Sequence, residues 1–135
     1  MAPIFLLDTN ICIYIQRQRP ECVLDRFKNL RPGEAAISMI TWGELLYGAE
    51  KSRQRDNVMT LLHEFSTFVP VRPMPEQAGR SYGSIRAFLE TQGTPIGNND
   101  LWIAAHAIAE NLVLVTHNER EFSRVPGLNV QNWVS

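Results

Sequence analysis

The sequence predicts an α/β fold in which helices cover both faces of a central, mostly parallel sheet. Two apolar runs, at 4–7 and 112–115, have the composition of strands that are buried on both faces. Elsewhere apolar residues recur at helical spacing in several separate segments. Because strands and helices alternate along the chain, we expect right-handed crossovers that join parallel strands.

The first half of the chain contributes two of the expected strands. The run at 4–7 stops at a single carboxylate, Asp8, and an apolar helical pattern over 9–17 follows at once. Pro20 fits the first turn of a second helix. A brief strand is expected at 35–38, and a helix that begins near Thr41 should end in the polar run 51–56.

The second half repeats this alternation. A helix is expected over 58–65, and the strand-like run 68–71 contains Pro70, which favours an edge position in the sheet. Helices over 75–92 and 98–110 are separated by a Gly/Pro loop. The remaining elements are expected as follows: a strand at 112–116, a helical turn at 119–122 and a small strand at 128–130.

Length and composition restrict the class of protein. At 135 residues, 44% hydrophobic and 20% charged, the chain is expected to form a single domain over 1–135. No apolar run reaches the length of a membrane span, and no secretory signal is recognisable. Cys12 and Cys22 have no metal-binding spacing, which favours a reducing compartment and hence the cytoplasm. The net charge of −1 decides nothing about nucleic acid, although 11 of the 13 basic residues are Arg, which suits phosphate.

Several acids share one local context, which is the end of a strand or the start of the next helix. They are Asp8 after the first strand, Glu44 and Asp100 at helix starts, and Glu119 and Glu121, with the amide Asn118 beside them, after the strand that ends at Thr116. In a doubly wound sheet these places lie toward one edge. Carboxylates that converge there repel one another unless their pKa values rise or a cation binds. Oxygen ligands without a Cys or His cluster suit Mg²⁺ or Mn²⁺.

Each acid also has a simpler structural explanation. Asp8 fits a helix N-cap, and Thr41-x-x-Glu44 fits a capping box. Asp100 fits a role in complementing the helix dipole, and Glu119 and Glu121 fit a solvated helix face.

The histidines give no clear catalytic pattern. His63 and His106 lie in helical patterns, where a packing role is the simpler interpretation, and His117 follows the second buried strand. The chain has no Walker loop, no GxGxxG and no recognisable Ser or Cys nucleophile motif.

Four blocks taken in order resemble PIN-domain ribonucleases, and among them the VapC toxins of bacterial VapBC toxin–antitoxin pairs. The blocks are LDTNI at 7–11, SMITWGELLYG at 38–48, IGNNDLWIAAHA at 96–107 and LVTHNEREF at 114–122. The ending RVPGL at 124–128 with Asn132-Trp133 also fits this group, so the resemblance spans the chain.

The resemblance implies a PIN-like α/β/α sandwich and a Mg²⁺- or Mn²⁺-dependent endoribonuclease. It implies a homodimer that is neutralised by an antitoxin whose C-terminal segment covers the active groove. Asp8 and Asp100 match the family's two best-defined metal-binding aspartates, and Glu44 matches its acid on the third helix. At the fourth acidic position this sequence departs from the family, with Asn118 or Glu121 as the nearest substitutes.

The leading hypothesis is therefore a toxin that hydrolyses a phosphodiester in structured RNA and leaves a 5′-phosphate and a 3′-hydroxyl. The group it resembles often cuts tRNA, and the chain is most similar to members that act on initiator tRNA. Two alternatives remain. One is a catalytically silent module that acts only through its antitoxin; the other is an aspartyl phosphatase with Asp8 as nucleophile, disfavoured because Asn10 stands where a second acid is usual.

Overall fold

Five short strands form one parallel sheet with the order β3-β2-β1-β4-β5 in the computed structural model, which describes residues 2–134. In chain order the elements are β1 (Phe5–Leu7), α1 (Thr9–Arg17), α2 (Glu21–Lys28), β2 (Ala35–Ser38), α3 (Met39–Glu50), α4 (Arg55–Phe68), β3 (Val71–Arg72), α5 (Gln77–Thr91), α6 (Asn98–Ala109), β4 (Val113–Val115), α7 (Glu119–Phe122) and β5 (Val130–Gln131). The predicted α/β architecture is confirmed. None of the helices within residues 2–134 is both long and apolar enough to cross a bilayer.

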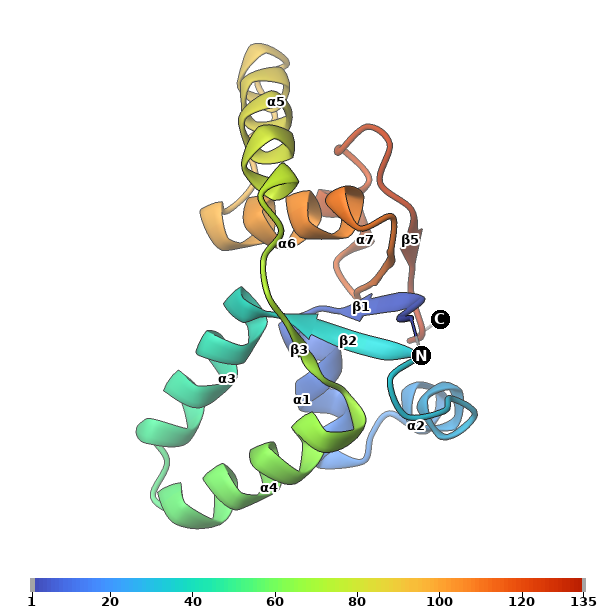
Figure 1. The fold of residues 1–135 in the computed structure, drawn as a ribbon, viewed down its shortest axis with the longest axis vertical. Helices are drawn as coiled ribbons and strands as arrows, with labels where there is room; N and C mark the ends of the chain where they lie inside the picture. Colours follow the sequence, from blue (N-terminus) through green and yellow to red (C-terminus); the bar gives the residue numbers. More distant parts are fainter. Residues whose placement is uncertain (1, 135) are drawn as a thin grey trace.

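The sheet separates two groups of helices, which gives an α/β/α sandwich (Figure 1). Helices α1–α4 lie on one side of the sheet, and α5–α7 lie on the other. Leu6 and Leu7 show how β1 serves both layers. Each is fully buried, but Leu6 packs with α5 and α6 whereas Leu7 packs with α1, α3 and α4. Successive side chains of a strand point to opposite faces, so the apolar run of β1 supplies both cores.

The ends of some elements differ from the sequence-based expectation. Ile4 lies before β1 and is 48% exposed, so the buried run is shorter than predicted. Phe68 ends α4 instead of starting a strand, because the helical apolar spacing continues and its ring packs edge-on against Phe27. The strand that follows is only Val71–Arg72, and it lies at the sheet edge, as Pro70 predicts.

The register of the sheet determines which residues lie side by side at the carboxyl ends of the strands. Leu7 pairs with Val115, so the next residues, Asp8 and Thr116, lie side by side at the carboxyl ends of β1 and β4. The chain order also reverses here, because β2 and β3 extend the sheet to one side of β1, and β4 and β5 to the other. In open α/β sheets ligands bind at such a switch point.

Helix α6 brings a third segment to this place. Small residues on its buried face, Ala104 and Ala107, are fully buried and allow the helix to pack close to the sheet. Helix α5 then packs on α6 and extends away from the sheet (Figure 1). The first turn of α6 carries Asp100.

Candidate active site

Asp8 is a buried carboxylate held at both oxygens. It is 5% exposed and caps α1, with Oδ1 accepting a hydrogen bond from the Ile11 N–H at 3.0 Å. Oδ2 accepts from the Thr116 hydroxyl, which also accepts from the Asn118 N–H at 2.9 Å. The capping explanation is therefore correct for one oxygen only, and β4 fixes the other. Both bonds hold the carboxylate at the switch point.

The pKa of Asp8 is raised despite these bonds. Burial is the main cause, and the nearby charge of Glu44 adds to it, while the bonds from Thr116 and Ile11 act in the opposite direction. Burial penalises the ionised form because the carboxylate loses its water. An anion in this position is destabilised, and a cation beside it would relieve that cost.

Glu44 does not form the predicted capping box. The N-cap of α3 is Ser38, whose Oγ accepts from the Thr41 N–H at 3.1 Å, and Glu44 lies beyond the first turn. The correction has a simple cause: helix α3 begins at Met39, two residues before the expected start, so Thr41 falls inside the helix. The Glu44 carboxylate instead accepts from the Thr9 hydroxyl at 2.5 Å and from Asn99 Nδ2 at 3.3 Å. It thereby joins α3 to α1 and α6.

Asp100 carries the clearest electrostatic signature of the site. It lies in the first turn of α6, where the helix dipole favours an anion, yet its pKa is raised from 3.8 to about 6. Partial burial is the largest cause, followed by repulsion from Glu121, Asp8 and Glu44. The N-cap of α6 is Gly97, and Asp100 makes no capping bond. The dipole alone therefore does not explain its position, because burial and the repulsion from its neighbours together outweigh the dipole.

Asn118 and Glu121 occupy the fourth position. Both follow β4, and Asn118 Nδ2 donates to Glu121 Oε2 at 2.5 Å. Glu121 is the strongest source of repulsion on Asp100 and also lies within hydrogen-bond reach of it. The structure thus brings together Asp8, Glu44, Asp100, Asn118 and Glu121, which come from four segments of the chain.

Other residues considered from the sequence lie outside this cluster. Glu119 accepts from Asn132 at 2.9 Å and is directed toward the C-terminal segment. His63 is exposed on α4, and His117 is exposed beside Tyr14. His106 is fully buried on α6, with Nε2 bonded to Glu110 at 2.5 Å and Nδ1 without a partner among the described residues. The predicted packing role of His106 agrees with its burial.

The acids suit a hydrated divalent ion better than a closed protein cage. Within residues 2–134, no three Asp, Glu, His or Cys side chains form a compact group that could by itself enclose a metal ion. A divalent ion that keeps several waters needs only one or two protein carboxylates, so acids that do not form a closed cage can still hold one. Burial, together with neighbouring carboxylates, raises the pKa values of Asp8 and Asp100, so a cation bound beside them would favour their ionised forms. The donor set therefore fits the ion.

Two threonines and an asparagine were missed by the sequence reasoning. Thr116 holds Asp8, while Thr9 and Asn99 hold Glu44. Thr116 had a usable signal, since it directly follows the buried strand 112–115 and the parallel register places it beside Asp8. The other two had none, because their contacts depend on how α1, α3 and α6 pack.

The chain is similar in sequence and in structure to known proteins over nearly its full length. The family model described as PIN domain matches residues 5–128. The tRNA(fMet)-specific endonuclease VapC of Shigella flexneri is 43% identical over 129 residues, which cover 96% of this chain and 97% of that protein. Among solved structures, DNA-bound VapBC from Salmonella typhimurium gives a TM-score of 0.90 at 42% identity, covering 98% of this chain and 99% of that one. VapBC-1 from nontypeable Haemophilus influenzae gives the same TM-score and coverage at 41% identity.

Proposed function

Since this chain belongs to the PIN-domain family and is a VapC-type ribonuclease, we propose that it is the toxin of a toxin–antitoxin pair and cleaves tRNA. The proposal extends to initiator tRNA, because relatives more than 40% identical over almost the full chain carry that specificity in their names. We place the protein in the cytoplasm, where that substrate is found. We further propose that residues 1–135 form a single PIN domain.

The observation that carries the proposal is the gathering of Asp8, Glu44, Asp100 and Glu121 at the switch point, where burial and neighbouring charge raise the pKa values of Asp8 and Asp100. Acids that repel one another lower the stability of the metal-free protein. Such a cost is expected where the residues are needed for function. Asp8 and Asp100, with Glu44, would hold a divalent cation, Mg²⁺ or in its place Mn²⁺. When bound, such an ion neutralises charge on a phosphodiester and lowers the pKa of water.

The side chains themselves have separable tasks. Thr116 and the Ile11 N–H keep Asp8 in one orientation, so its free lone pairs face the same direction throughout a reaction. Asp100, whose pKa is raised to about 6 by burial and by the charges of Glu121, Asp8 and Glu44, holds a proton more readily than an exposed aspartate. Asn118 donates to Glu121 Oε2 and so restrains the carboxylate that lies within hydrogen-bond reach of Asp100. Hydrolysis by water at this site leaves a 5′-phosphate and a 3′-hydroxyl.

The antitoxin segment has a fitting surface next to these acids. A cavity of about 330 Å³ lies between α1, α3 and α4, with an apolar lining that includes Ile13, Leu45 and Leu62. Glu44 and Gly48 also border it. We assign this cavity to the antitoxin of the pair, since the solved relatives are VapBC complexes. A segment seated there reaches Glu44 and blocks the acids. The protein also pairs with itself, as is typical of this family.

The experiment is cleavage of initiator tRNA by purified protein with Mg²⁺, with Mn²⁺ or with EDTA. We expect cleavage with either ion, none in EDTA, and losses of at least about a hundredfold in Asp8→Asn and Asp100→Asn. Glu121→Gln is compared with Glu119→Gln, a matched change on the same helix whose carboxylate is directed elsewhere. Full activity of Asp8→Asn, cleavage in EDTA, or a 2′,3′-cyclic phosphate product would reject the proposal.

Growth measurements separate the proposed enzyme from the silent antitoxin-binding module. Expression of the wild type should arrest growth, and expression of Asp100→Asn should not. Arrest that persists after loss of Asp8, Glu44 and Asp100 together would favour the silent module.

A further inference from the structure

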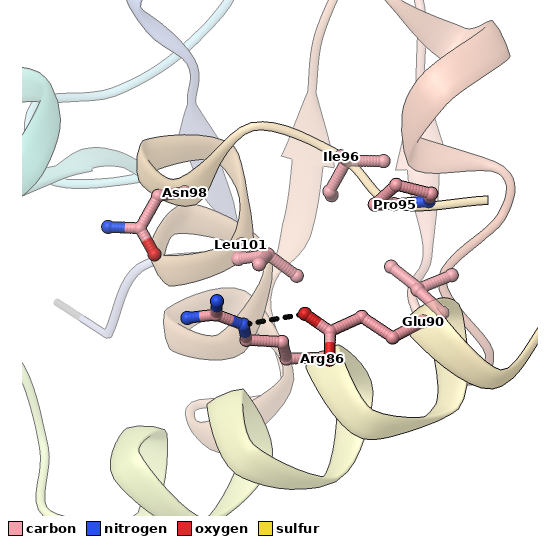
Figure 2. Close-up of a pocket in the computed structure, with 7 residues that line it drawn as sticks. Arg86, Glu90, Pro95, Ile96, Asn98 and Leu101 are labelled. Atoms are coloured by element: carbon pink, nitrogen blue, oxygen red, sulfur yellow. Dashed lines mark hydrogen bonds and ion pairs between the residues drawn. The ribbon is translucent and has the colours of Figure 1, made fainter. Parts of the chain in front are cut away.

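A small pocket lies between α5, α6 and the loop that joins them. It encloses about 160 Å³, with a polar edge formed by Arg86, Glu90 and Asn98. Its floor is apolar and buried, and consists of Leu89, Ile96 and Leu101, with Pro95 at one side. Figure 2 shows Arg86 and Glu90 paired across the lower edge, with Leu101 between them and the Ile96–Pro95 wall. The cluster of acids does not include any of these residues.

Arg86 has hydrogen-bonding capacity left over. Its Nε donates to Glu90 at 3.1 Å and one terminal nitrogen donates to the Tyr82 hydroxyl at 2.8 Å. A guanidinium has five N–H groups, so three remain without a partner among the described residues. The side chains of Arg86 and Glu90 are 51% and 58% exposed, so both reach solvent. Pairs of this kind contribute little to stability, which leaves them free for recognition.

The pocket is connected to the acids through the start of α6. The Tyr82 hydroxyl donates to Asn98 Oδ1 at 2.5 Å, and Asn98 is two residues before Asp100. The Tyr82 ring stacks on Trp102 with centroids 3.9 Å apart. On the other side of the loop, Arg124 donates to the Pro95 carbonyl at 3.2 Å. The pocket and Asp100 therefore share the first turn of α6, so an RNA bound at Asp100 has the pocket as a neighbouring surface.

We propose that this pocket binds one unpaired nucleobase of the RNA substrate and that Arg86 and Glu90 read its edge. The inference rests on the function proposed above and locates a specificity site within it. The pocket is smaller than the 300–1,000 Å³ typical of drug-sized ligands, so it suits a single ring system and not a larger ligand.

The chemistry of the pocket matches a base better than a phosphate. Glu90 would repel a phosphate, whereas base edges carry donors and acceptors side by side. A carboxylate next to a guanidinium offers one acceptor and one donor group in the same plane of approach. The apolar floor accommodates a ring face. Proteins that recognise RNA by sequence usually read bases that are splayed out from single-stranded regions.

The test combines single abasic sites in the RNA with substitutions in the protein. RNAs that the wild type cleaves are prepared with one base removed at each position around the scissile bond. For each RNA, kcat/KM is measured for wild type, Arg86→Gln and Glu90→Gln. Arg80→Gln is the matched control, because Arg80 lies on the same helix outside the pocket. Melting temperatures verify that every variant is folded.

We expect one abasic position to lower kcat/KM of the wild type by about tenfold or more. Arg86→Gln should lose about tenfold on intact RNA and show no further loss at that position, with Glu90→Gln behaving alike. Arg80→Gln should keep the wild-type pattern. The same RNAs are titrated against Asp8→Asn by fluorescence anisotropy. If the protein binds RNA but never cleaves it, the proposed function is rejected. The titration still shows whether removal of one base weakens RNA binding, which tests the pocket separately.

Three results would overturn the inference. The first is a wild type insensitive to every abasic position. The second is an Arg86→Gln variant that keeps the same sensitive position, or that loses activity equally on all RNAs with a weaker salt dependence, which indicates a phosphate contact. The third is an Arg86→Gln variant that cleaves normally but binds the antitoxin more weakly, which would make the pocket a protein-docking site.

Discussion

Replacing Asp100 by Asn should make the metal-free protein more stable while it abolishes catalysis. Asp100 is partly buried and faces the charges of Glu121, Asp8 and Glu44, which raise its pKa from 3.8 to about 6. Asn has nearly the same shape and no charge, so the substitution removes this repulsion. A residue that weakens the fold and is needed for chemistry is expected at a functional site.

The size and the direction of the change in unfolding free energy follow from the raised pKa of Asp100. A tenfold change in proton affinity corresponds to about 1.4 kcal/mol, so the shift from 3.8 to about 6 sets an upper limit of roughly 3 kcal/mol. Screening by solvent at the partly exposed carboxylate reduces the expected free energy to about 1–2 kcal/mol. Because the folded state holds the proton more tightly, wild-type stability falls as the pH rises from about 4 through about 6 and stays low above that range.

The assay is thermal unfolding of wild type, Asp100→Asn and Glu119→Gln at pH 5 and pH 7.5, in EDTA and with Mg²⁺. At pH 7.5 in EDTA, Asp100→Asn should melt about 3–8 °C above wild type, and the gap should narrow at pH 5. Adding Mg²⁺ should stabilise wild type but not Asp100→Asn. If Asp100→Asn melts no higher than Glu119→Gln at pH 7.5 in EDTA, the buried charge of Asp100 does not weaken the metal-free fold.

Three further changes test other parts of the account. Thr116→Val removes a buried donor to Asp8, so we expect about 1–3 kcal/mol lower stability by urea unfolding and at least tenfold lower kcat; unchanged kcat would contradict the positioning role. Trp133→Ala empties a fully buried site and should cost about 3–5 kcal/mol in the same unfolding assay, so a loss below 1 kcal/mol would refute it. Gly48→Trp projects from open space into the cavity between α1, α3 and α4 and should abolish antitoxin binding in calorimetry without slowing RNA cleavage. Gly79→Trp, at an equally open helical glycine, is its control, and equal antitoxin affinity of the two variants would place the antitoxin elsewhere.

The sequence alone predicted the α/β fold and the positions at which a strand ends and the next helix begins. The strand before Asp8 and the strand before Thr116 were recognisable because buried parallel strands are short, continuous apolar runs. A parallel sheet then brings their carboxyl ends together, which is why Asp8 and the residues after Thr116 were expected to meet. Asp100 followed from the Gly/Pro loop and the apolar helix beside it.

Element ends and side-chain contacts that depend on tertiary packing could not be predicted from the sequence. Ser38 and Thr41 are both good N-cap residues, and only the start of α3 at Met39 decides between them. Phe68 fits a strand or a helix by its type, and its contact with Phe27 on α2 determines the outcome. The bond from Asn99 to Glu44 spans two helices far apart in the chain, so no local pattern could reveal it.

The most direct test of the central claim is a titration of the protein with Mn²⁺, followed by electron paramagnetic resonance, in wild type, Asp8→Asn, Asp100→Asn and Glu119→Gln. If acids from separate segments share a bound cation, wild type and Glu119→Gln should bind Mn²⁺ with the same affinity, and the two Asp variants should lose at least about tenfold. Equal Mn²⁺ affinity in all four proteins would contradict the claim that Asp8 and Asp100 form one metal site.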